Sequence, residues 1–391
     1  MSIEWKASEL GKIAFTTSGG TPSRKNENYY SGGTIPWVKS GELEFGTITK
    51  AEEFITQDGI DNSSAKIFPK GTLLIALYGA TIGKLSFLGI DAATNQAVCG
   101  IFENDTVDLK YLYYFLLFQR PNLVRQGIGG AQPNISQTIL KKLMVPYPKE
   151  KSEQERIVAK IEELLSELDN GVETLKKTKR QLEVYRQSVL KKAFERAEKY
   201  VLFGSITESR LGKMLDKEKN AGIFQPYLRN INVRWFSFDL SDLLEMKIKP
   251  EEKEKYSVSK GDLVICEGGE PGRCAVWENN KTMYYQKALH RVRFKDGSNP
   301  KFYMYYLWFA AQSGKLNPFF TGTGIKHLTG QSLAKIPVPT ATKDKQDSAV
   351  QEIEMNLSKC ENLEKTIETA LQQAEAMRQS VLKKAFEGTL V

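Results

Sequence analysis

A glycine-rich string at residues 79–84, GATIGK, comes nearest to phosphate chemistry. A phosphate-binding loop needs four residues between its glycines and a serine or threonine after the lysine, because backbone amides cradle the phosphate and the hydroxyl holds magnesium. Here three residues separate the glycines, and Leu85 follows the lysine. The spacing therefore argues against nucleotide binding at this loop.

Other residue types that perform catalysis are sparse. The chain has two histidines and four cysteines, none in a CxxC pair, so we expect buried thiols rather than a metal site or disulfides. The string VPYP at residues 145–148 lacks the polar residue and the paired prolines of an aminomethylation motif. No carboxylate cluster with a lysine suggests a nuclease. Catalysis is therefore expected on other proteins.

The elements that would position binding residues are organised by a repeat. The string YRQSVLKKAFE at residues 185–195 recurs as MRQSVLKKAFE at residues 377–387, and each copy ends a long charged segment that follows a globular block. A repeat of about half the chain indicates a duplicated globule plus helix. We therefore predict globular domains at 1–148 and 200–342, followed by long helices at 149–199 and 343–391.

Apolar residues in both helical segments recur at steps of three and four, which predicts a coiled-coil seam. The first seam would hold Ile157, Ile161, Leu164, Leu168, Leu175, Leu182, Tyr185 and Val189. The second would hold Ile353, Leu357, Cys360, Leu363, Ile367, Ala370, Ala374, Met377 and Val381. Because a long charged rod needs a partner to cover its stripe, we expect the two helices to pair antiparallel within one chain. A coiled coil between two chains is the alternative.

The second globule repeats the first in outline. IPWVKS at residues 35–40 corresponds to QPYLRN at 225–230, and the strings that begin PKGTLLIALYG and SKGDLVICEGG both predict a turn, a strand, a glycine turn, a cation and a strand. The aromatic segments 110–119 and 301–308 are expected to form core helices. A shared scaffold with different loops is typical of two readers of unlike targets.

The charge is unevenly divided. The chain has 55 basic and 47 acidic side chains; residues 1–148 carry 14 and 13 of them, whereas residues 200–342 carry 21 and 14. A basic globular surface indicates a polyanion, usually nucleic acid. No apolar run approaches the roughly 18 residues that a membrane span needs, and the N-terminus has no hydrophobic signal core. We therefore expect a cytoplasmic protein without a membrane partner.

Over essentially its whole length the chain resembles the specificity subunit of type I restriction-modification enzymes. The resemblance rests on the order of the segments and on particular strings: EQERIVAKIEELL and YRQSVLKKAF in the first helix, LRNINV, KGDLVICEGGEPGRCAVW and GTGIKHLTG in the second globule, and KIPVP before the second helix. It implies an α+β fold with two β-rich target recognition domains, separated by two long antiparallel helices that form an intramolecular coiled coil with a pseudo-two-fold repeat.

The resemblance also implies a division of labour. The subunit itself would be non-catalytic, and each domain would read one half of a bipartite, asymmetric sequence in double-stranded DNA. Two methylation subunits would bring S-adenosylmethionine and modify adenine, and restriction subunits would use ATP and Mg to translocate and cut DNA. This chain would need no cofactor. The repeat suits docking of two identical partners through Arg186, Lys191, Phe194, Arg378, Lys383 and Phe386, although the repeat could instead merely preserve packing.

Cations and amides on loops are the residues that would contact DNA. Arg and Lys suit guanine, and Asn and Gln suit adenine. In the first domain the candidates are Ser23, Arg24, Lys39, Tyr78, Thr81, Lys84 and Gln132. In the second domain they are Lys219, Tyr227, Arg229, Asn230, Arg273, Lys326 and His327.

Two other classes of protein fit parts of the sequence. A coiled-coil scaffold with two modules that bind proteins would explain the helices, and it would show no salt-sensitive affinity for duplex DNA. An autonomous methyltransferase or nuclease would need the motifs that are missing above. If the helices separate two DNA readers, inserting one helical turn in both should lengthen the preferred spacer between the half-sites, and an unchanged spacer would contradict this expectation.

Overall fold

The computed structural model describes residues 3–126, 134–195, 199–216 and 220–391. The chain divides into two compact units, residues 1–175 with 369–391 and residues 176–368. Both long helices, α5 (Lys151–Glu195) and α9 (Lys343–Phe386), therefore contribute a part to each unit. The domain boundaries expected from the sequence instead treat each long helix as a segment separate from the globules. Those boundaries stay a prediction.

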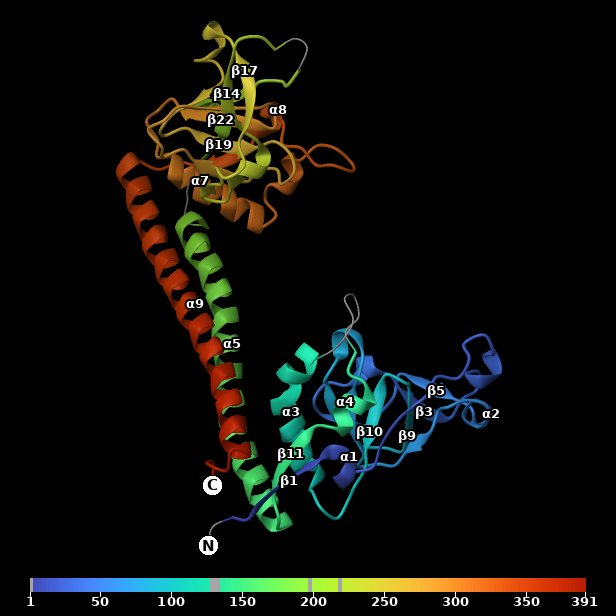
Figure 1. Ribbon diagram of the computed structural model, residues 1–391. Helices are drawn as coiled ribbons and strands as arrows, with labels where there is room; N and C mark the ends of the chain where they lie inside the picture. Colours follow the sequence, from blue (N-terminus) through green and yellow to red (C-terminus); the bar gives the residue numbers. More distant parts are fainter. Residues whose placement is uncertain (1–2, 127–133, 196–198, 217–219) are drawn as a thin grey trace. The chain divides into compact units, whose positions relative to one another are not determined.

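The first unit is a β-rich globule covered by helices (Figure 1). Its strands are β1 (Trp5–Glu9), β2 (Thr16–Ser18), β3 (Ile35–Val38), β4 (Thr47–Ile48), β5 (Glu53–Ile55), β6 (Ile67–Phe68), β7 (Leu73–Ala76), β8 (Leu85–Leu88), β9 (Ala92–Thr94), β10 (Val98–Ile101) and β11 (Met144–Pro148). Its helices, besides its parts of α5 and α9, are α1 (Leu10–Ile13), α2 (Gln57–Asp61), α3 (Leu109–Gln126) and α4 (Gln137–Lys141).

The two main sheets of this globule run β2-β10-β7-β8-β4 and β5-β3-β9-β6, and β1 pairs with β11 in a separate two-stranded sheet. All four residues of β7 are buried, which explains their unbroken apolar run. The hairpin between β7 and β8 is antiparallel, as the sequence predicted. Helix α3 lies beside the sheet, and its buried residues share a core with β7, β10 and the start of α5.

The second unit has the same kind of architecture. Its strands are β12 (Tyr200–Leu202), β13 (Thr207–Leu211), β14 (Ile223–Leu228), β15 (Val233–Arg234), β16 (Ser237–Phe238), β17 (Leu244–Ile248), β18 (Ser257–Val258), β19 (Leu263–Cys266), β20 (Cys274–Val276), β21 (Met283–Tyr285), β22 (Leu289–Phe294) and β23 (Pro337–Pro339). Its other helices are α6 (Phe203–Ile206), α7 (Pro300–Gln312) and α8 (Gly330–Ala334). The main sheets run β13-β22-β19-β20 and β17-β14-β21-β18.

Matching backbone features show that the two globules are copies. Phe45 and Phe236 both adopt a left-handed conformation that is uncommon for a bulky residue, with φ of 62° and 69°. The amide of Phe45 donates to the carbonyl of Leu85 at 2.9 Å, and the amide of Phe236 donates to that of Cys274 at 3.2 Å. Leu85 begins β8 and Cys274 begins β20, so both phenylalanines lie at equivalent places in their sheets.

A buried glutamine joins each globule to a long helix in the same way. The Gln154 side chain accepts a hydrogen bond from the amide of Asp108 at 2.8 Å, and the Gln346 side chain accepts one from the amide of Asn299 at 2.7 Å. Both glutamines are almost fully buried, at 0% and 2% exposure. Such groups are tolerated in a core because their hydrogen bonds are made.

The long helices pair antiparallel. In the second unit Lys179 contacts Glu368 at 2.8 Å, Arg186 contacts Glu364 at 2.7 Å and Lys192 contacts Glu352 at 3.0 Å. Residue numbers thus rise along α5 while they fall along α9. The intramolecular coiled coil expected from the sequence is confirmed.

One detail of the predicted seam is wrong. Tyr185, Leu363 and Met377 are 47%, 51% and 58% exposed. The buried positions of the α9 stripe are Ile353, Cys360, Ile367 and Ala374, which lie seven residues apart. A half-buried position between two of them comes four residues after the first and three before the next. Steps of three-then-four and four-then-three both fit the apolar pattern, and the sequence does not decide which neighbouring face is covered.

The repeated strings end in phenylalanines that close two equivalent aromatic clusters. The ring of Phe386 lies 5.2, 5.3 and 5.8 Å from those of Tyr111, Phe115 and Phe118 on α3, measured between ring centroids. Phe194 lies 5.3, 5.5 and 5.8 Å from the α7 rings, which are Phe302, Tyr306 and Phe309. Each repeat therefore packs on the globule that does not immediately precede it: the first repeat packs on the second globule, and the second repeat on the first.

Candidate nucleic-acid interface

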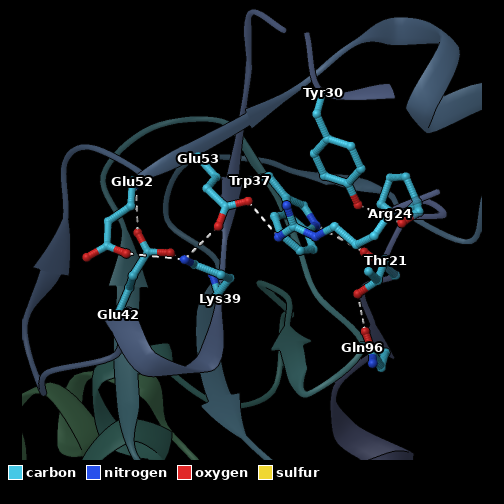
Figure 2. Close-up of polar contacts among 11 residues, drawn as sticks. Thr21, Arg24, Tyr30, Trp37, Lys39, Glu42, Glu52, Glu53 and Gln96 are labelled. Carbon is cyan, nitrogen blue, oxygen red and sulfur yellow. Dashed lines mark hydrogen bonds and ion pairs between the residues drawn. The ribbon is translucent and has the colours of Figure 1, made fainter. Parts of the chain in front are cut away.

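Charged and aromatic side chains gather at the end of β3 in the first unit. We call this group the Arg24 cluster; it comprises Thr21, Arg24, Tyr30, Trp37, Lys39, Glu42, Glu52, Glu53 and Gln96 (Figure 2). The Arg24 guanidinium carbon lies 4.4 Å from the Tyr30 ring centroid and 5.1 Å from that of Trp37. Its Nη2 donates to Glu53 Oε2 at 2.6 Å. The arginine side chain is nevertheless 54% exposed, so it is held in place and still open to a ligand.

Lys39 shares the same carboxylate. Its Nζ donates to Glu53 Oε1 at 2.9 Å and lies 3.3 Å from Glu52 Oε2. The hydrogen bond to Glu53 raises the pKa of Lys39, and the same bond lowers the pKa of Glu53. The Lys39 amide donates to Glu42 at 2.8 Å, which fixes the turn after β3. Lys39 and Arg24 are therefore both tied to the Glu53 carboxylate.

The loop that carries Arg24 is packed against its neighbours. An added Cβ on Gly19 would lie 2.1 Å from the carbonyl oxygen of Thr94, closer than real Cβ atoms come, so only glycine fits there. The indole Nε1 of Trp37 donates to the carbonyl of Gly20 at 3.0 Å, and the Tyr30 hydroxyl donates to that of Pro22 at 2.6 Å. The platform under Arg24 thus also anchors its loop.

A second group of predicted residues meets at the turn between β7 and β8. The Thr81 hydroxyl donates to the carbonyl of Tyr78 at 3.1 Å, and the amide of Lys84 donates to that of Thr81 at 2.9 Å. Tyr78 forms a β-bridge with Asn134. Ser23 is exposed on the loop of Arg24. Gln132 lies outside the described residues.

In the second unit, Arg273, Asn230 and His327 converge on the turn at residues 268–272. Arg273 donates to Glu270 at 2.7 Å and to the carbonyl of Asn230 at 2.9 Å, and its side chain is only 14% exposed. An added Cβ on Gly268 would lie 3.2 Å from Nδ1 of His327. These contacts give Arg273 a clear role in holding the turn.

The remaining candidates of the second unit differ in accessibility. Arg229 is 18% exposed and donates to the Asp242 carboxylate at 2.7 Å, whereas Lys326 is exposed. Tyr227 is 3% exposed and packs with Met246, so its expected role as a surface DNA contact is wrong for this structure. Tyr227 packs in one core and the neighbouring Leu228 in another, so side chains at this end of β14 are buried in both directions. Burial raises the pKa of the Tyr227 hydroxyl. Lys219 lies outside the described residues.

The predicted docking residues at the helix ends fall into two kinds. Phe194 and Phe386 are 1% and 6% exposed in the aromatic clusters, so they are not surface docking groups, and the interpretation that the repeat preserves packing fits them. Arg186 is paired with Glu364, and Arg378 with Asp169. The side chains of Lys191 and Lys383 are exposed.

Sequence reasoning missed the acidic and aromatic members of the Arg24 cluster. Glu53 lies on β5, 29 residues after Arg24, and β5 pairs antiparallel with β3. The adjacent carboxylates Glu52 and Glu53 are the feature of the sequence that could have indicated these ion pairs. They point to Lys39 only once the pairing of β3 with β5 is known.

Metal-binding side-chain clusters and membrane-spanning helices are both missing from the part of the chain that the structure describes. No group of three or more His, Cys, Asp or Glu side chains there could hold a metal ion. Burial raises the pKa of the Cys99 thiol to about 12 and that of Cys266 to about 11. Among the same residues no helix is long and apolar enough to cross a membrane.

The chain is similar in sequence to specificity subunits of type I restriction enzymes. The chain is 31% identical over 196 residues to the specificity subunit of the type I restriction enzyme MjaIX of Methanocaldococcus jannaschii, covering 49% of this chain and 44% of the relative. It is 25% identical to the EcoR124I/EcoR124II specificity subunit of Escherichia coli, covering 47% of each. The chain thus spans less than half the length of these two relatives. Identity to the EcoKI specificity subunit of Escherichia coli is 23%, over 93% of this chain and 84% of the relative.

Solved structures agree on the fold. A chain from a study of complex assembly and conformational transition of the type I R-M system has a TM-score of 0.78 at 17% identity, with 100% of both chains covered. The HsdS subunit from Thermoanaerobacter tengcongensis has a TM-score of 0.64 at 17% identity, covering 98% and 97%. The type I restriction modification DNA specificity domain matches residues 2–184 and again 199–373. The chain therefore belongs to this family and carries two copies of its domain.

Proposed function

We propose that this chain recognises a bipartite, asymmetric sequence in double-stranded DNA and directs partner subunits to methylate adenine or to restrict the DNA. The first unit would read one half-site and the second unit the other. Two methylation subunits, with S-adenosylmethionine, and restriction subunits, with ATP and Mg, would supply the chemistry in the cytoplasm. Family membership supports DNA specificity as the general role.

The observation that carries the proposal is one scaffold with two sets of loop side chains. Lys39 and Arg229 each precede a short 3-10 turn after equivalent strands, and each backbone amide donates to the side chain three residues on, at 2.8 and 2.9 Å. The side chains around them differ: Lys39 meets Glu53, whereas Arg229 meets Asp242. Equivalent geometry with unlike chemistry is what two readers of different bases need.

The helices would serve the partners and the spacing. In the second unit Val184 and Met355 are 68% and 52% exposed on α5 and α9. Exposed apolar side chains on a charged helix suit a protein partner, so we place methylation-subunit docking on the outer faces of the helices in each unit by itself. Arg186 and Lys191 would take part in the second unit, and Arg378 and Lys383 in the first. Helix length would set the spacer between half-sites.

The test is co-expression of the chain with its cognate methylation subunit, followed by sequencing of host DNA for methyladenine. A two-part motif is expected, and the methylation subunit expressed alone should leave the DNA unmodified. An intact purified complex that modifies no adenine and shows no salt-sensitive affinity for duplex DNA would contradict the proposal. That result would favour the alternative of a scaffold with two protein-binding modules.

A further inference from the structure

We propose that Arg24 reads a guanine in the half-site bound by the first unit, that Tyr30 and Trp37 form its platform, and that Glu53 is its positioning residue. The inference rests on the proposed function and names the base that one side chain recognises. Arginine pairs with the O6 and N7 acceptors of guanine through two parallel N–H donors. The geometry of the Arg24 cluster supplies such a pair at the protein surface.

Two aromatic rings restrain the guanidinium. Its carbon lies 4.4 Å from the Tyr30 centroid and 5.1 Å from that of Trp37, and the two rings meet edge to face at 74°. An unrestrained arginine loses considerable side-chain freedom when it binds, so restraint before binding favours a directional contact. Tyr30 and Trp37 are themselves tied to the loop by their hydrogen bonds to Pro22 and Gly20.

Glu53 restrains the orientation of the Arg24 guanidinium further. Its contact engages one Nη2 donor of Arg24 at 2.6 Å, and a guanidinium has five N–H donors in all. The other donors can therefore point at a base edge. Glu53 is also held on its second oxygen by Lys39, at 2.9 Å, so the carboxylate cannot swing with the arginine.

The local charge argues for a base rather than a phosphate. The two cations of the Arg24 cluster, Arg24 and Lys39, pair with the carboxylates of Glu52 and Glu53. A third carboxylate of the cluster, that of Glu42, accepts from the Lys39 backbone amide. A group with more carboxylates than cations attracts a phosphate poorly, since phosphate affinity depends on uncompensated positive charge. A base edge is uncharged, and its acceptors need directed N–H donors. The cluster suits direct readout better than backbone positioning.

The experiment uses the purified complex with its methylation subunit and the motif found by methyladenine sequencing. Each guanine of each half-site is replaced in turn by another base pair or by 7-deazaguanine, which lacks the N7 acceptor. The wild-type complex should lose about five- to 150-fold in affinity when one guanine of one half-site is changed to another pair. Arg24→Ala should abolish that preference, and 7-deazaguanine should cost this variant nothing. Arg24→Lys should weaken the preference, because an ammonium cannot present the planar, paired donors of a guanidinium.

Two further variants separate the roles. Glu53→Gln keeps the shape but removes the charge that holds Arg24, so it should weaken the preference at the same guanine only. Arg234 is a matched control: it is a 51% exposed arginine of the second unit that is paired with a single carboxylate, Asp239. Arg234→Ala should leave the preference at the Arg24 guanine unchanged.

The outcomes separate the inference from the proposed function. Uniformly weaker binding to all duplexes by Arg24→Ala, full preference retained by Arg24→Lys, or a motif without guanine would each overturn the role of Arg24. Intact readout of the other half-site in the same variants would show that the complex is folded and assembled. A wild-type complex that modifies no adenine would instead overturn the proposed function.

Discussion

Replacing Phe386 by alanine should destabilise the globule at the opposite end of the sequence. Phe386 is the sixth residue from the C-terminus, yet its ring contacts the three α3 rings of the first unit, between 5.2 and 5.8 Å away. The side chain is 6% exposed. The substitution therefore opens a cavity in a core formed by residues far earlier in the chain.

The magnitude follows from the burial of the ring. A Phe→Ala change in a core costs about 3–5 kcal/mol, including the cavity that remains. Domains of this size are stable by only about 5–15 kcal/mol, so the loss is a large fraction of the total. For a domain of 150–250 residues each kcal/mol shifts the Tm by about 2–4 °C. The melting of the first unit should thus fall by about 6–20 °C.

Calorimetry combined with hydrogen exchange can measure this. The transition assigned by exchange to residues 3–126 should move, while that of residues 220–340 should stay in place. Phe194→Ala should do the reverse, since Phe194 packs on α7. Met377→Ala is the matched control on the same helix as Phe386, because Met377 is 58% exposed, and it should change stability by less than about 0.5 kcal/mol.

The reasoning would be refuted if Phe386→Ala lowered the melting of the second unit instead, or of neither unit. A shift no larger than that of Met377→Ala would show that the aromatic cluster does not form. Equal shifts of both transitions would show that the units unfold together, and the assignment of each repeat to one globule would fail.

Three further substitutions test other parts of the structure. Gly19→Ala forces a shift of the Arg24 loop, so first-half-site preference should fall and unfolding should become easier by about 1–3 kcal/mol, whereas Gly41→Ala, with open space around it, should have little effect in a binding and melting assay. Gln154→Leu should lower the free energy of unfolding by about 1–3 kcal/mol, because the backbone amide of Asp108 and the carbonyl of Pro148 lose their hydrogen-bond partner. Hydrogen exchange at the Asp108 amide should become faster. Burial lowers the pKa of His290 below 6.5, so below that pH the unfolded second unit binds a proton more readily than the folded unit does. The Tm of the second unit should therefore fall as the pH drops below about 6.5, and His290→Gln should make the Tm less dependent on pH.

The sequence predicted the strands, turns and long helices because each of them depends on residues close together in the chain. Apolar strands, glycine turns and the helical spacing of the long segments are all short-range patterns. The internal repeat then indicated which segments correspond. These signals suffice for the strand β3, the hairpin of β7 and β8, and the antiparallel helices.

Which predicted side chains stay accessible depends on which element covers which face. Tyr227 and Arg229 are two residues apart and are both assigned to DNA contact from the sequence. Packing covers the ring of Tyr227, whereas Arg229 pairs with Asp242 and its DNA contact stays a prediction. Phe194 and Phe386 are part of a conspicuous repeat, and nothing local shows that each packs on the other globule. Long-range pairing decides these roles, and one sequence does not reveal it.

The two globules hold equivalent turns with backbone contacts and leave a side chain free to differ. The turns after β3 and β14 are held by backbone amides that donate to Glu42 and Asn232, so the side chains of Lys39 and Arg229 are not needed to form the turns. Lys39 instead binds Glu53, which also contacts Arg24, and Arg229 binds Asp242. Because the backbone supplies the geometry of both turns, we expect substitutions of Lys39 or Arg229 to leave the turns intact. Under the proposed function, specificity would then vary in each half independently.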